Sequence, residues 1–310
     1  MKSRQVVIAF LVFVVSGMMV FFFQNCGGHN PSPNSEISLE RAIQLEAEAT
    51  PGPGTPPGAL PNSEDLVLWL KADDLKLRMG DRVGEWKDSS PAKNHAEQDE
   101  VPFQPVFFEN ALGDKPGVRF NGRSDFMRVP DSATLDLEEM TVVVALASEK
   151  TGGQSSGADA QWVLSKASAI GDFSSFGMLL TGDSVLFTVQ SALQMAFPRW
   201  GMRFDPSPAK PYVFLGSYRR EEGEARDGSV LSDGSSTQLL FIPNGYNSSF
   251  DPKLTHSEQP LQIGRNLHAE KGGTGYLHGY VFEVQVFKRR LSAVESYNVV
   301  NTLKKKWGIN

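Results

Sequence analysis

The stretch Tyr280–Phe287, with the sequence YVFEVQVF, is the most strand-like segment of the chain and indicates its fold class. Apolar residues such as Val284 and Val286 alternate in part with the polar Glu283 and Gln285. This period of two is expected of a strand with one face in a sandwich core. Because a buried carboxylate needs a partner, we expect Glu283 to form a structural pair with an arginine; a functional role and simple exposure are the alternatives.

The segment that follows this strand is predicted to be a helix. Ser292 and Glu295 have the spacing of a capping box, in which each side chain bonds the other residue's backbone N–H. Gly308 follows as a stop, and Trp307 is expected to anchor the helix on the sandwich. Apolar residues at helical spacing and lysines near the negative end of the helix dipole support this prediction: Val294, Tyr297, Val300 and Leu303, with Lys304, Lys305 and Lys306.

Upstream, short stretches rich in Val, Phe, Leu, Trp and Tyr recur between turn residues, without intervening helical patterns. We expect an all-β unit over residues 65–310, a two-sheet sandwich or jelly roll with one C-terminal helix. The stretches 197–211 and 219–233 are less regular. The remaining expected strands are Leu66–Leu70, Gly117–Asn121, Phe126–Val129, Met140–Ala147, Gln161–Leu164, Ser184–Val189, Tyr212–Tyr218, Gln238–Ile242 and Leu261–Gly264.

The N-terminus has the pattern of a secretory signal over residues 1–25, because Lys2 and Arg4 precede an apolar run from Val6 to Phe23. Cys26 follows directly and resembles the acylated cysteine of bacterial lipoproteins. We expect lipidation of Cys26; an uncleaved membrane helix and a free thiol are the alternatives. By that resemblance, the absence of aspartate at the next position implies an outer-membrane lipoprotein in the cell envelope, held to the membrane by its lipid anchor.

Residues 26–64 form a Pro- and Gly-rich stretch that is expected to be a lipid-anchored linker.

The composition of the whole chain limits its partners. The 310 residues hold 30 Lys and Arg against 36 Asp and Glu, a net charge of -6, which argues against nucleic acid as a ligand. The single Cys excludes an intrachain disulfide framework and Cys-rich zinc sites.

Two ordered blocks resemble the bacterial laminin G-like domains of the concanavalin A-like lectin and glucanase superfamily. The resemblance covers about residues 65–310 and implies a concanavalin A-like jelly roll with a ligand face for carbohydrate or a cell-surface protein. It also leaves a bound calcium open, for which acidic loops around Asp73, Asp74, Asp81, Asp227 and Asp233 are candidates. The blocks are Leu68–Asp73, Trp86–Ser89, Asn94–Ala96 and Val118–Gly122, then Ile263–Arg265, Leu277–Glu283, Leu291–Glu295 and Lys306–Gly308.

Catalytic patterns are weak. Ser155 lies in a G-x-S-x-G string, but its surroundings do not form the strand, turn and helix of a nucleophile elbow. Retaining glucanases of the superfamily carry an E-x-D-x-E strand, which this chain lacks. The histidines, among them His268 and His278, show no zinc-protease spacing. We therefore expect a protein that is not an enzyme.

The expected function is non-catalytic recognition or adhesion at the cell surface, with carbohydrate or a surface protein as ligand. A structural subunit of an envelope assembly and a cryptic polysaccharide hydrolase or lyase are the alternatives. Aromatic rings beside short polar side chains in loops are the features that bind sugars. Trp200, Asn244 and Tyr246 are accordingly the candidate ligand-binding residues, although packing roles for both rings remain open.

Overall fold

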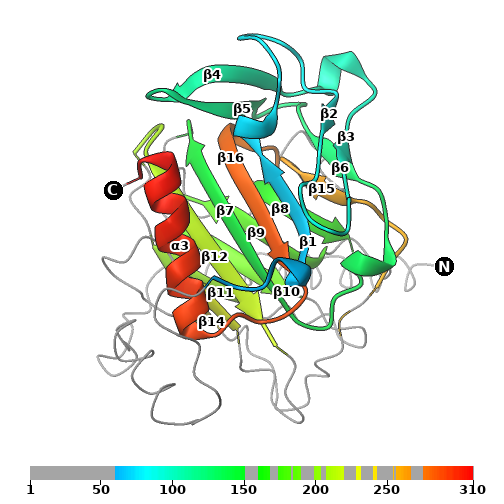
Figure 1. Cartoon of the computed structure of the whole chain (residues 1–310), viewed down its shortest axis with the longest axis vertical. Coiled ribbons are helices and arrows are strands. Elements are labelled where there is room, and N and C mark those ends of the chain that lie inside the picture. The colour runs from blue at the N-terminus through cyan, green and yellow to red at the C-terminus, as the bar shows by residue number, and fades with distance from the viewer. Residues whose placement is uncertain are drawn as a thin grey trace, which may run out of the picture.

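A computed structural model describes residues 60–150, 160–167, 174–182, 184–189, 199–203, 207–219, 228–231, 240–242, 254, 256–266 and 275–309. Within them, sixteen strands form two antiparallel sheets, and the chain ends in one α-helix (Figure 1). The fold is a two-sheet jelly-roll β-sandwich, as expected. In the described part of the chain, no helix is long and apolar enough to span a bilayer.

The first sheet contains, in spatial order, β13 (Gly228–Leu231), β12 (Pro211–Tyr218), β7 (Met140–Ser148), β16 (His278–Phe287), β5 (Lys115–Asn121) and β4 (Val106–Leu112), with β1 (Leu66–Lys71) also paired to β16. The second contains β14 (Leu240–Ile242), β11 (Arg199–Arg203), β10 (Ser184–Val189), β9 (Ser174–Thr181), β8 (Gln161–Ala167), β15 (Leu261–Ile263), β6 (Met127–Val129), β3 (Ala96–Glu97) and β2 (Glu85–Trp86). The helices are η1 (Ser63–Asp65), η2 (Ala72–Asp74), η3 (Val101–Phe103), η4 (Ala133–Leu135) and α3 (Ala293–Trp307).

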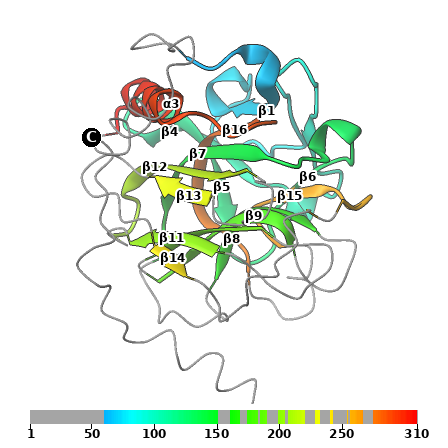
Figure 2. The same ribbon diagram turned by 90° about the horizontal axis from the view of Figure 1, so that it is seen from below.

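The two sheets enclose the core between them, and α3 covers the outer face of the first sheet over β12 and β7 (Figure 2). The strand that indicated the fold class, β16, lies inside this sheet. On one side it pairs with β7. On the other side its first half pairs with β5 and its second half with β1. One strand therefore connects the beginning, the middle and the end of the body.

The loop after β2 is held by a single buried carboxylate. Asp88 is 3% exposed and accepts hydrogen bonds from the backbone N–H groups of Trp69, Ser90 and Asn94, at 2.7, 2.8 and 2.6 Å. Asp88 therefore bonds its own turn, at Ser90 and Asn94. Trp86 on β2 is fully buried, whereas Trp69 on β1 is only partly buried.

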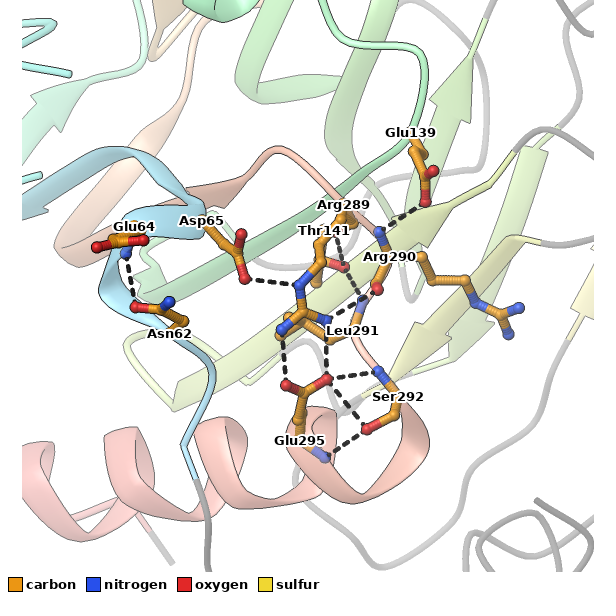
Figure 3. Close-up of polar contacts among 10 residues, drawn as sticks. All are labelled: Asn62, Glu64, Asp65, Glu139, Thr141, Arg289, Arg290, Leu291, Ser292 and Glu295. Atoms are coloured by element: carbon orange, nitrogen blue, oxygen red, sulfur yellow. Dashed lines mark hydrogen bonds and ion pairs between the residues drawn. The ribbon is translucent and has the colours of Figure 1, made fainter. Parts of the chain in front are cut away.

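Helix α3 begins with the expected capping box, in which Ser292 and Glu295 bond each other's backbone N–H. Figure 3 shows how this box is tied to the rest of the body. Arg289 donates to both carboxylate oxygens of Glu295, at 2.9 and 2.7 Å, and to Asp65 at 2.7 Å. The Thr141 hydroxyl bridges the backbone at Arg289 and Leu291. The first turn of the helix is thus joined to the start of the body and to β7.

Glu283 is 1% exposed, and its carboxylate is satisfied by four donors. Oε1 accepts from Trp69 Nε1 at 2.5 Å and from Gln285 Nε2 at 2.8 Å. Oε2 accepts from Lys306 Nζ at 2.6 Å and from Trp307 Nε1 at 3.0 Å. A structural partner is therefore present, but the cation is Lys306 and not the arginine that we expected. The helix end supplies it because Trp307 packs against Phe282.

Most expected strands are present within a few residues of their predicted ends. Strands β2, β3, β4 and β9 were not expected, and two stretches that seemed irregular contain strands. Strand β11 lies within 197–211, and β13 within 219–233. Both strands are short. Strand β11 pairs with β10 and β13 pairs with β12, and the apolar residues of β10 and β12 are buried. Pairing with these neighbours outweighs the weak pattern of their own sequence.

Candidate functional site

A partly exposed group of polar and aromatic side chains lies on the first sheet where β7 ends and β16 begins. Glu149 is at its centre. Arg119 donates to Glu149 Oε2 from Nε at 2.9 Å and from Nη2 at 2.8 Å, and His278 Nε2 lies 3.3 Å from the same oxygen. The Tyr280 hydroxyl interacts with both Glu149 and Arg119. The ring of Phe108 meets that of Tyr280 edge-to-face, with centroids 5.6 Å apart. We call these five residues the Glu149 cluster.

Strand register brings the cluster together from four segments. Tyr280 on β16 is directly opposite Arg119 on β5, and cross-strand pairs share one face of a sheet. Glu149 comes directly after β7, and its N–H bonds the carbonyl of His278 at 2.8 Å. Phe108 comes from β4, the strand next to β5.

Gly279 makes the close approach of β16 and β7 possible at this end. Its φ is 153°, and a Cβ there would lie 2.2 Å from the carbonyl oxygen of Ala147. A residue with a side chain would therefore force the two strands apart next to the cluster.

The cluster is electrically balanced yet open to solvent. The side chains of Arg119, Glu149 and His278 are 32%, 23% and 37% exposed. Hydrogen bonding to Glu149 raises the pKa of Arg119, so its guanidinium is a permanent cation. Burial, followed by the charge of Glu149, raises the pKa of the Tyr280 hydroxyl, which therefore keeps its proton near neutral pH. The group presents fixed donors, a carboxylate acceptor and two aromatic rings side by side.

This combination suits a ligand with many hydroxyls and one apolar face. Guanidinium N–H groups and a carboxylate can exchange hydrogen bonds with vicinal hydroxyls, while the C–H face of a ring packs on an aromatic side chain. The ion pair holds the polar groups in place before a ligand arrives, which lowers the entropy cost of binding. Glu149 is the only carboxylate among the five residues of the cluster.

The residues predicted from sequence are not among the five residues of the Glu149 cluster. Trp200 is in β11, where its backbone is opposite Phe187 and Phe241, and not in the exposed loop that we expected. Only its backbone position is described. Asn244, Tyr246 and Cys26 lie outside the described residues, as do Ser155 and His268.

The acidic residues that were candidates for calcium are engaged by cations or backbone where they are described. Asp73 binds Lys306 at 3.1 Å, and Asp74 binds Lys71 at 2.8 Å. Asp81 accepts from the backbone N–H of Arg78. The other two candidates, Asp227 and Asp233, lie outside the described residues. Across the described ranges, no group of three or more His, Cys, Asp and Glu side chains is arranged to hold a metal ion.

Comparison with known proteins supports the fold. No protein-family model and no curated protein matches the chain. Among solved structures, Trypanosoma rangeli sialidase in complex with sialic acid is similar with a TM-score of 0.51 and 16% identity, over 86% of this chain and 38% of that chain. The binding domain of botulinum neurotoxin serotype G has a TM-score of 0.52 and 13% identity, over 76% of this chain and 51% of that chain.

The binding domain of Paraclostridial Mosquitocidal Protein 1 is similar to the same degree, with a TM-score of 0.51 and 10% identity, over 76% of this chain and 52% of that chain. The chain therefore spans between 38% and 52% of the length of these three proteins. At such low identity the likeness concerns the β-sandwich fold.

The sequence contained only partial signals for the Glu149 cluster. Arg119, His278 and Tyr280 all fall within the blocks that resemble laminin G-like domains, but none was singled out as a ligand-binding residue. Glu149 follows the end of a predicted strand, a position where functional side chains often occur. Nothing in the linear order indicated that Arg119 and Glu149 would meet.

Proposed function

We propose that this protein is a non-catalytic carbohydrate-binding lipoprotein of the cell surface, and that the Glu149 cluster is its sugar-binding site. The observation that carries the proposal is the arrangement of the Arg119–Glu149 ion pair beside the partly buried rings of Tyr280 and Phe108. Two neighbours in structure are binding domains and a third is a sialidase bound to sialic acid, which agrees with this reading. As part of the same proposal, residues 65–310 form a laminin G-like domain.

The position of the cluster suits a protein tethered by its N-terminus. Asp65 marks the start of the body, and the next residue, Leu66, pairs with Phe287 at the far end of β16. Tyr280 lies seven residues earlier on that strand, a separation of about 23 Å at 3.3 Å per residue. A linker running from an acylated Cys26 to Asp65 would therefore hold the cluster away from the membrane, where it can meet glycans.

A glycan array on the full chain in non-ionic detergent tests the binding function. We expect binding to a restricted set of glycans, weakened at least tenfold by Tyr280→Ala and by Glu149→Gln, with melting temperatures close to that of the wild type. Tyr297→Ala is the matched control, because Tyr297 is an exposed tyrosine, 44% accessible, on α3 outside the cluster. If Trp200→Ala abolishes binding while Tyr280→Ala does not, the site is wrong.

Mass spectrometry of the mature N-terminus tests the anchor. We expect a diacylated Cys26 as the first residue, and loss of membrane retention in Cys26→Ala. An intact segment from Met1 to Cys26 would contradict the proposal.

A further inference from the structure

The charges of the Glu149 cluster limit which sugars it can accept. Arg119 is the one permanent cation among its five residues, and Glu149 is its counter-ion. The Nε and Nη2 groups of Arg119, which lie 2.9 and 2.8 Å from Glu149 Oε2, form an edge of the guanidinium that suits a carboxylate. A carboxylate on a ligand would therefore have to displace Glu149 before it could bind this edge.

Glu149 is held in this position without any ligand. Its backbone N–H donates to the His278 carbonyl at 2.8 Å, so the residue is tied to the start of β16 whatever its side chain binds. His278 Nε2 lies 3.3 Å from the oxygen that Arg119 contacts, and it adds positive charge only when protonated. Because the side chain of Glu149 is 23% exposed, a ligand that approaches Arg119 also meets the negative charge of Glu149.

A second pair of opposite charges next to the cluster is balanced in the same way. Hydrogen bonding to Glu149 raises the pKa of Arg119, and the charge of Asp125 adds to this rise. Asp125 is 2% exposed, and its carboxylate accepts from the backbone N–H of Asn121 at the end of β5. Arg82 Nη1 lies 3.9 Å from Asp125 Oδ1. Together the two arginines and the two carboxylates carry no net charge, so they lack the positive field that would attract an anionic sugar.

We propose, on the basis of the sugar-binding function proposed above, that the Glu149 cluster selects uncharged sugars over acidic ones and that Glu149 determines this preference. A neutral hexose offers hydroxyls, which can donate to the carboxylate and accept from the guanidinium without breaking the ion pair. A uronic acid carries a carboxylate in place of one hydroxymethyl group. Its charge would lie beside that of Glu149, and such a contact between like charges rejects a ligand.

Glycan arrays probed with the full chain in non-ionic detergent, at about pH 8 where free imidazole is neutral, test this preference. The probes are oligosaccharides of glucose, galactose and mannose, each printed beside the uronate oligosaccharide of the same linkage. We expect the wild type to bind the neutral member of a pair at least tenfold more tightly. Glu149→Gln should reverse the order, because the guanidinium of Arg119 is then free to bind the ligand carboxylate through two parallel hydrogen bonds.

Three further variants separate the charge of Glu149 from other effects. Glu149→Ala opens the same edge of Arg119 and should raise uronate binding at least tenfold over the wild type. In the Glu149→Gln protein, the additional change Arg119→Gln should remove this gain. Asp114→Asn is the matched control, because it also removes one negative charge but its side chain is 86% exposed beside Lys115, outside the cluster. It should leave the preference for neutral sugars unchanged.

The possible outcomes distinguish the preference for neutral sugars from the binding function itself. If the wild type binds uronate oligosaccharides at least as tightly as neutral ones, and Tyr280→Ala weakens both, the cluster is a sugar site but the inferred preference is wrong. No gain of uronate binding in either Glu149→Gln or Glu149→Ala would also overturn the role of Glu149. If neither the wild type nor the Glu149 variants bind any of the glycans, the binding function and the preference both fail.

Discussion

Replacement of Glu283 by glutamine should destabilise the whole body, because one buried carboxylate holds the helix end against the sheet. In the wild type, both oxygens accept two hydrogen bonds each, from Trp69 and Gln285 on one side and from Lys306 and Trp307 on the other. A glutamine keeps only one acceptor oxygen. Whichever way its amide turns, the NH₂ group faces two donors.

The magnitude follows from these contacts. Breaking a buried pair by removing one partner costs about 3 to 5 kcal/mol in unfolding free energy. Because Lys306 is 30% exposed and also reaches Asp73, solvent and the second carboxylate offset part of the lost ion pair. We therefore expect Glu283→Gln to lower the unfolding free energy by about 3 kcal/mol, mostly through the unsatisfied indole and amide donors.

Urea unfolding followed by tryptophan fluorescence measures this loss directly, since two of the indoles bond Glu283. A double-mutant cycle with Lys306→Met isolates the ionic part. The double variant should be more stable than the sum of the two single losses predicts, by at least about 0.5 kcal/mol, because Glu283→Gln removes the charge that Lys306→Met leaves buried. A loss below about 1 kcal/mol for Glu283→Gln, or strict additivity, would refute the reasoning.

Three further perturbations test other parts of the structure. Burial raises the pKa of Asp125 to about 6. Because this pKa exceeds that of Asp125 in the unfolded chain, the folded state binds more protons between about pH 4 and 6. The unfolding free energy should therefore fall as pH rises through that window, by up to about 3 kcal/mol. In Asp125→Asn, melting curves recorded against pH should not show this fall. Gly279→Ala should lower the unfolding free energy by about 1 to 3 kcal/mol and weaken glycan binding at the neighbouring cluster. Gly113→Ala is the control, because a Cβ at Gly113 meets nothing within 4 Å. It should lower the unfolding free energy by about 1 kcal/mol and leave glycan binding intact. Asp65→Ala should lower the unfolding free energy by about 1 to 2 kcal/mol in urea titrations, since it removes one of the two carboxylates on Arg289; an unchanged midpoint would show that the Glu295 bond suffices.

Much of the fold could be predicted from local patterns. Alternation in Tyr280–Phe287 and the spacing of Ser292 and Glu295 are short-range features, and each produced the expected element. Trp200 shows the limit of such patterns. A tryptophan beside proline and glycine suggests an exposed loop, but pairing with the strand of Phe187 places it in a sheet.

The sequence by itself determined the class of fold and the C-terminal helix, because side-chain period, capping and turn residues act over a few positions. Only the tertiary structure decided which polar groups meet. Arg119 reaches Glu149 through the register of antiparallel strands far apart in the chain. Strand register is selected by the burial of all the apolar residues on one face of the sheet, so it depends on many residues and cannot be predicted from a single motif.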